Sequence, residues 1–184
     1  MTYHVHKQGS ILGLEERLDE IVQFVVDNFI PAGYGGITLS QPDATFPDLG
    51  AGWVELVADQ LSIDPPRAIT PDLAQNSLAF DVKGVWSISF GFTIDHDSSN
   101  GGRTINLRFF DKTDNDARGS LPIGIGRNVE VTSQFLTVFL DIAEDDIGHP
   151  FSIEVGGGDT VVIDSLDTFI YNAQYVSEFQ GELP

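Results

Sequence analysis

A long alternation of apolar and small or polar residues between Leu78 and Phe110 constrains this chain more than any other feature. Turn-rich residues 97–102 (DSSNGG) interrupt it, and the alternation then resumes. Successive side chains of a strand point to opposite faces, so alternation of this length requires a half-buried antiparallel sheet. We expect the apolar set to be buried between two sheets: Trp86, Ile88, Phe90, Phe92, Ile94, Ile105, Leu107 and Phe109.

Most of the remaining chain also has strand patterns separated by turn residues. Strands are expected at 36–40, 53–58, 78–82, 85–95, 103–111, 120–125, 129–142, 150–155, 160–163 and 168–176. The Gly-rich run Gly156–Asp159 predicts a hairpin turn, and residues 61–76 predict an extended loop along a sheet edge. Short strands at this spacing predict an all-β fold, an antiparallel β-sandwich of the jelly-roll type.

The chain divides into three zones. Residues 1–30 form an arm and a predicted α-helix, residues 31–77 an irregular connecting segment with edge strands, and residues 78–184 the jelly roll. The helix is predicted because apolar residues recur at spacings of three and four, as in a heptad seam. Its interpretation stays open between a short stem that trimerises and a helix packed on its own β-domain. The seam residues assigned to a trimer contact are Leu14, Leu18, Ile21 and Val25.

Charge and composition exclude several classes of function. The chain has 9 Lys and Arg against 28 Asp and Glu, a net charge of −19. Such a chain is repelled by nucleic acid and by anionic membranes, so we expect neither as a partner. It has no cysteine, which excludes disulfides, thiolate metal sites and cysteine nucleophiles. The G-x-S-x-G, P-loop and H-E-x-x-H motifs are missing, and we expect neither catalysis nor a cofactor.

Two predicted strands are apolar on both faces, which is unusual for a strand of a sandwich with one solvated face. A partner subunit is one explanation for the second apolar face. Cover by the N-terminal helix or by the loop at 41–77 is the other. Under the first explanation, Phe135, Phe139, Tyr171 and Tyr175 lie at a homotrimer interface.

Acidic loops and histidines supply candidate metal ligands. Asp111, Asp114 and Asp116 offer oxygens suited to calcium, although the spacing is not that of an EF-hand. His4 and His6 would gather imidazoles on a threefold axis. His96 lies between two aspartates and is either a ligand or a surface or interface residue. The alternative interpretation of the acidic loops is that they are simply solvated.

The run Phe80-Asp81-Val82-Lys83-Gly84-Val85-Trp86-Ser87-Ile88-Ser89 resembles the F-x-v-x-x-G-x-[YW]-x-[IV]-[ST] pattern of tumour-necrosis-factor-like jelly rolls. Residues 165–176 resemble the last core strand of that family, so the resemblance covers roughly residues 78–176. The segment 31–77 is longer and more irregular than the family pattern. The resemblance implies a tight homotrimer.

A short N-terminal stem followed by such a jelly roll also resembles virion proteins of tailed bacteriophages, among them capsid decoration proteins, head fibres and tail-fibre tips. That likeness implies a non-enzymatic structural protein of the virion, anchored by its N-terminal segment to other virion proteins such as the major capsid protein. Two alternatives stay open: a receptor- or glycan-binding tip of a tail fibre, and a polysaccharide-degrading enzyme. The loops at 97–102 and 111–119 contain no aromatic residue, which argues against the glycan-binding alternative.

Overall fold

The computed structural model of the chain describes residues 17–18, 21, 33–50, 52–156 and 158–177. Gly33–Pro184 forms one compact unit, separate from Met1–Ala32. All the strands of the described residues belong to this compact unit. The predicted N-terminal helix falls almost entirely outside the described residues and stays a prediction.

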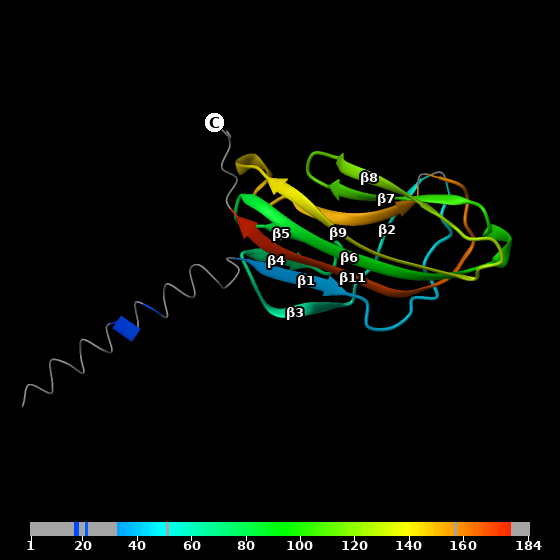
Figure 1. Cartoon of the computed structure of the whole chain (residues 1–184), viewed down its shortest axis with the longest axis horizontal. Coiled ribbons are helices and arrows are strands. Elements are labelled where there is room, and N and C mark those ends of the chain that lie inside the picture. Colours follow the sequence, from blue (N-terminus) through cyan, green and yellow to red (C-terminus); the bar gives the residue numbers. More distant parts are fainter. Residues whose placement is uncertain (1–16, 19–20, 22–32, 51, 157, 178–184) are drawn as a thin grey trace, which may run out of the picture. The chain divides into compact units, whose positions relative to one another are not determined.

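The compact unit is a sandwich of two antiparallel sheets, seen as two layers in Figure 1. The five-stranded sheet has the order β3-β1-β11-β6-β9, and the six-stranded sheet has the order β4-β5-β10-β7-β8 with β2 also paired to β10. This confirms the antiparallel β-sandwich. The strands are β1 (Tyr34–Thr38), β2 (Trp53–Glu55), β3 (Gln60–Arg67), β4 (Ile69–Asp72), β5 (Ser77–Phe80), β6 (Gly84–His96), β7 (Thr104–Asp111), β8 (Asp116–Gly124), β9 (Val131–Ile142), β10 (Pro150–Gly156) and β11 (Ile163–Ser177).

The chain repeatedly crosses from one sheet to the other, as in a jelly roll. The two long alternating segments are β6 and β7, which lie in opposite sheets and are joined by the short 3-10 helix η1 (Ser98–Asn100). A second 3-10 helix, η2 (Glu144–Asp146), lies between β9 and β10. Within the described residues, no helix has both the length and the hydrophobicity that crossing a bilayer requires.

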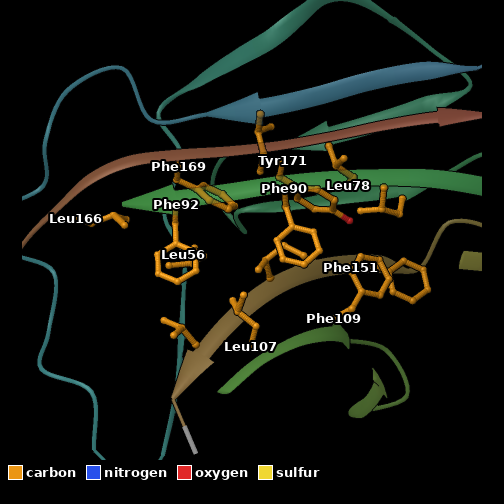
Figure 2. Packing of buried hydrophobic residues seen from close by; sticks show 14 of the residues in the cluster. Leu56, Leu78, Phe90, Phe92, Leu107, Phe109, Phe151, Leu166, Phe169 and Tyr171 are labelled. Carbon is orange, nitrogen blue, oxygen red and sulfur yellow. The ribbon is translucent and has the colours of Figure 1, made fainter. Parts of the chain in front are cut away.

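The core lies between the sheets and contains all eight residues of the predicted apolar set. Figure 2 shows Phe90 and Phe92 pointing from one layer toward Leu107 and Phe109 in the other. The rings of Phe109 and Phe151 stack with centroids 5.1 Å apart. The alternation therefore predicted both the strands and the face that each one buries.

Three segments differ from expectation. The predicted loop at 61–76 contains most of β3 and all of β4, each of which forms one edge of its sheet. Strands β10 and β11, on either side of the hairpin turn predicted at 156–159, lie in different sheets and do not pair as a hairpin. Residues 160–162 form no named strand, and β11 starts at Ile163 instead of Thr168.

Residues 34–72 supply β1 to β4 to both sheets, so no division of the structure falls at residue 78. Backbone pairing ties this early segment to the end of the chain, with Ile37 of β1 opposite Tyr171 of β11. The segment expected to be an irregular connection with edge strands thus supplies β3 and β4 as edge strands and β1 as an inner strand.

Candidate association surface

Strand β9 presents large aromatic side chains to solvent. Phe135 and Phe139 are 67% and 71% exposed, and Val138 is also exposed. The first two point away from the core, because their neighbours Leu136 and Leu140 pack against it. The described part of the loop at 41–77 therefore does not cover this face. Exposed aromatic side chains next to each other on one strand form a candidate contact surface.

The neighbouring strand β6 is built of small residues where these phenylalanines lie. Phe135 is opposite Gly91, and Phe139 is opposite Ser87. A Cβ atom added at Gly91 would lie 2.8 Å from Cδ2 of Phe135, so the ring lies directly over the glycine. The hydroxyls of Ser89 and Thr137 are hydrogen-bonded at 3.0 Å between the two phenylalanines. The alternation that buries the large side chains of β6 thus places small and polar residues on its outer face, beside the two phenylalanine rings.

A cleft of about 250 Å³ opens beside this surface, where the edge strands of the two sheets face each other. Its β9 wall contains Leu136, Val138, Phe139 and Leu140, and its β8 wall contains residues from Arg118 to Leu121. Phe90, Leu107 and Phe109 of the core also line the cleft. Phe139 therefore belongs both to the cleft and to the exposed face.

The structure corrects the placement of Tyr171. This residue is fully buried in the core, where its ring meets that of Phe109 edge-on at 6.1 Å. Burial raises the pKa of its hydroxyl well above the ordinary value. The apolar residues on both faces of β11 predict an interface position for Tyr171, but Phe169, Tyr171 and Ala173 all face inward. Tyr171 is therefore not available to a partner subunit.

The other residues assigned to the interface belong to different parts of the chain. Tyr175 is half-buried and packs edge-on against Trp86 with ring centroids 5.3 Å apart. Leu18 and Ile21 are each 60% exposed. Leu14 and Val25 lie outside the described residues, as do the candidate metal ligands His4 and His6.

The acidic residues at 111–116 divide into two groups. Asp111 and Asp114 gather with Asp146 and His149, and one possible ligand atom from each lies within 4.8 Å of the others. Asp116 is not part of this group; its carboxylate accepts from the N–H of Ala117 at 2.9 Å. Four ligand atoms at this spacing suit a cation, and a positively charged side chain of the same chain fills that place.

The guanidinium of Arg118 lies among these carboxylates. It contacts Asp111 at 2.8 Å, Asp114 at 3.3 Å and Asp146 at 2.5 Å. His149 Nδ1 lies 3.1 Å from the same Asp111 oxygen. The group is accordingly a network of ion pairs that ties the β7–β8 hairpin to η2 and the start of β10.

A β-bulge directs Arg118 into this network. Along β7 and β8 the pairing passes from Phe109–Gly119 to Phe110–Ala117, which leaves Arg118 as the extra residue. Bulges bend a strand and redirect a side chain. Sequence reasoning missed Arg118, Asp146 and His149; the available signal was a single arginine within an acidic loop.

The network shifts the pKa of its members. Burial opposes ionisation of Asp111, but hydrogen bonds from Arg118, from His149 and from the backbone N–H groups of Asp114 and Thr113 outweigh it and lower the pKa of Asp111. The hydrogen bond to Asp111 raises the pKa of Arg118. Both shifts favour the charged pair.

His96 is buried, which corrects its expected place at the surface or in an interface. Its Nε2 lies 2.9 Å from the hydroxyl of Thr132. The neighbouring Asn100 is also buried and donates to the carbonyl of Val162 at 2.9 Å. This polar group fastens η1 to β9 and to the start of β11, so His96 has a structural role at the end of β6.

No family model and no curated protein matches the sequence. Solved structures do match. Murine APRIL at pH 5.0 aligns with a TM-score of 0.51 at 7% identity, over 77% of this chain and 98% of that chain. Eiger TNF from S. frugiperda aligns with a TM-score of 0.51 at 12% identity, over 84% of this chain and 98% of that one. The PRD1 vertex protein P5 gives a TM-score of 0.49 at 8% identity, over 79% and 74%.

At sequence identities this low, structural similarity shows a shared fold and nothing about function. APRIL and Eiger align over almost their entire length with this chain. The compact unit is therefore similar to tumour-necrosis-factor-like jelly rolls, which confirms the fold implied by the run at 80–89.

Proposed function

We propose that this chain is a non-enzymatic structural protein that works as a homotrimer assembled through the exposed face of β9. One observation carries the proposal: Phe135 and Phe139 are mostly exposed on an outer sheet face. Burying a phenylalanine side chain stabilises a contact by about 1.5–3 kcal/mol. A symmetric assembly repeats that gain at each interface. The tumour-necrosis-factor-like fold, which the sequence resemblance associates with trimers, supports the same stoichiometry.

The proposed location is the outer surface of a bacteriophage particle, as a decoration or fibre protein. The sequence pattern of an arm and helix before a jelly roll supports this location, with residues 1–30 as the anchor and other virion proteins, such as the major capsid protein, as partners. The net charge of −19 disfavours nucleic acid and anionic membranes as partners. A receptor- or glycan-binding tip of a tail fibre remains the second candidate, because it needs the same trimeric jelly roll.

Sedimentation velocity at micromolar concentration tests self-association. Wild-type protein is expected to sediment as a trimer. Phe139→Asp is expected to abolish the trimer, because it places a charge in an apolar contact. Val162→Asp is the matched control, since it adds the same charge at another exposed apolar position and should leave the trimer intact. A wild-type monomer would overturn the proposal.

Two further assays address location and chemistry. Co-sedimentation with isolated particles should recover the full chain in the particle fraction. Incubation with capsule or cell-wall polysaccharide should release no reducing ends. Release of reducing ends by the purified protein, and its loss on heat denaturation, would replace the structural function with the polysaccharide-degrading alternative.

A further inference from the structure

The edges of the two sheets differ in how they are protected. A sheet edge exposes unpaired N–H and C=O groups, and proline blocks pairing there because it lacks the N–H donor. Among the described strands that lie at sheet edges, three contain proline: β3 contains Pro65 and Pro66, β4 contains Pro71, and β8 contains Pro122. The three-residue β2, which pairs only with β10, and the twelve-residue β9 contain none.

Strand β9 is also the most regular of these edges. Its twelve residues pair one-to-one with β6 without a register shift, whereas β3 and β8 both carry irregularities. In the described part of the chain β9 pairs with β6 alone. Antiparallel pairing uses the N–H and C=O groups of alternate residues on each side, so the other half of these groups face outward.

The charge pattern singles out the same strand. Residues 131–140, VTSQFLTVFL, contain no charged side chain, and Asp141 is the only charge in β9. Elsewhere the chain is strongly acidic, with a net charge of −19, and like charges oppose contact between copies. Strand β9 is where two copies can meet with least repulsion.

We propose that β9 pairs antiparallel with β9 of a second copy, which joins two five-stranded sheets into one continuous sheet. The contact is isologous, so a two-fold axis relates the strands. The backbone N–H and C=O groups of every second β9 residue face outward, and only these residues can form hydrogen bonds to the second copy. Each outward-facing residue must therefore lie opposite an outward-facing residue of the second copy. This condition is met only when the two-fold axis passes through the level of a residue, and not midway between two consecutive residues.

The register centred on Thr137 matches the side chains best. Phe135 then lies opposite Phe139 of the second copy, and Phe139 opposite Phe135 of that copy. Aromatic pairs directly across two strands stabilise them by about 0.2–1 kcal/mol each. Ser133 lies opposite Asp141 of the second copy, so the single charge in β9 faces a neutral hydroxyl.

This inference goes beyond the proposed function, because the two contacts use different parts of β9. A trimer contact covers the outer face, which the phenylalanine side chains form. Strand pairing uses backbone groups in the plane of the sheet. Threefold and two-fold axes combine in one closed assembly of two trimers, so strand pairing predicts an assembly with an even number of chains.

Single cysteines provide the test, because the chain has none of its own. In the Thr137-centred register the two Thr137 Cα atoms lie about 4.5–5.5 Å apart, within the range that a disulfide spans. Thr137→Cys should form a covalent dimer under mild oxidation. Ser133→Cys is the matched control: it is also exposed and also hydrogen-bonded to a β6 hydroxyl, but it would lie about 26 Å from its counterpart.

Introduced charges give a second test of the register. Thr137→Lys places two ammonium groups opposite each other and should weaken pairing, since like charges across strands are unfavourable. Ser133→Lys places an ammonium group opposite Asp141 and should preserve pairing or strengthen it. Both variants should keep the wild-type circular dichroism spectrum and melting temperature, because both positions are exposed.

The outcomes separate this inference from the proposed function. A covalent Thr137→Cys dimer without a Ser133→Cys dimer supports strand pairing. Equal crosslinking of the two variants, or none in either, overturns it, and a trimer in sedimentation then leaves the proposed function standing. If only Thr137→Cys crosslinks and the protein sediments as a dimer, strand pairing is supported and the trimer is contradicted. Wild-type monomer without crosslinking removes both.

Discussion

Trp86 shows how a single core residue links several parts of the sandwich. The ring of Trp86 fills the space between the sheets, with its centroid 4.9 Å from Phe80. Its indole N–H donates to the carbonyl of Val82 at 3.1 Å. A buried tryptophan needs such an acceptor, so this side chain couples the start of β6 to the turn before it.

Phe90 gives the residue-scale prediction for the core. Phe90→Ala should lower the free energy of unfolding by about 3–5 kcal/mol, because the buried ring is lost and a cavity remains. Urea denaturation followed by tryptophan fluorescence measures the change. Val131→Ala is the control, since Val131 is exposed at the end of β9 and should change stability by less than about 0.5 kcal/mol. Equal effects at the two positions would contradict the assigned burial.

Asp111 gives a prediction about pH. Its pKa is lowered in the folded chain, so the unfolded chain holds more protons near this pKa. The carboxylate therefore contributes stability above the unfolded pKa of about 3.9, and that contribution is lost as pH falls through the lower folded value. Asp111→Asn should lower the free energy of unfolding at pH 7 by about 1.5–3 kcal/mol, the value of hydrogen bonds to a charged group.

Denaturation curves at pH 7, 5, 4 and 3 test this expectation. The difference between wild type and Asp111→Asn should be constant down to about pH 5 and shrink below pH 4. Asp116→Asn is the matched control, because Asp116 is the first residue of β8, in the same hairpin but outside the network. A difference that stays constant to pH 3 would show that ionisation of Asp111 contributes nothing.

Sequence reasoning at this scale worked where one face of a strand is clearly polar. Ser87, Ser89 and Thr93 identified the outer face of β6, and the burial of the opposite face followed. On β11 both faces carry large apolar side chains, and nothing local indicated that Tyr171 points inward. The Arg118 network was out of reach because it depends on a bulge that brings Asp146 to the β7–β8 hairpin.

At the scale of elements, the central strands hold the sandwich together. Strand β6 is flanked on both sides, by β11 and by β9, and alternate residues along it are buried. Strand β10 is likewise flanked by β5 and β7. Edge strands have one partner only, and their backbone groups open more readily to solvent.

Amide hydrogen exchange should reproduce this order. The slowest amides are expected in β6, β10 and β11, and the fastest strand amides in β3, β4 and β8. Amides of β9 should exchange quickly in dilute monomer and become protected as protein concentration rises, because association covers that strand. Protection in β9 that does not depend on concentration, in a sample that sediments as monomer, would contradict an open edge.

The sequence predicted a strand where its residues show a clear strand pattern, and failed where prolines interrupt that pattern. Strands β6 and β7 were predicted within two residues at each end because their side chains alternate. Strand β9 was predicted equally well from its long run of strand-forming residues, although both of its faces carry apolar side chains. Strands β3 and β4 were predicted as a loop, since Pro65, Pro66 and Pro71 normally weaken a strand assignment. An edge position tolerates these prolines. The sheet that each strand joins was not predictable, because pairing of distant segments leaves no local pattern.

At the scale of the whole molecule, the compact unit begins at Gly33, and among the described residues it contains the whole buried core. Deleting residues 1–30 should therefore leave a folded sandwich with a largely unchanged thermal unfolding transition. Attachment to the particle should be lost if this segment is the anchor.

A melting curve and a pull-down with particles test the deletion together. If the N-terminal segment instead stabilises the sandwich, deletion should lower stability by several kcal/mol, on the order of uncovering a few large side chains. Retained attachment together with a strongly lowered melting temperature would contradict the anchoring role.

The pairing of β1 with β11 has a mechanical consequence. These strands are antiparallel neighbours, with Tyr34 opposite Gln174 and Thr38 opposite Ile170. The chain thus enters and leaves the sandwich at the same end of one sheet. Tension applied through both flanking segments would load the β1–β11 hydrogen bonds one pair after another, beginning at Tyr34, and would peel the strands apart at low force. Tension through the N-terminal flank against a contact at β9 would instead be shared across β1, β11 and β6, and the sandwich would resist it.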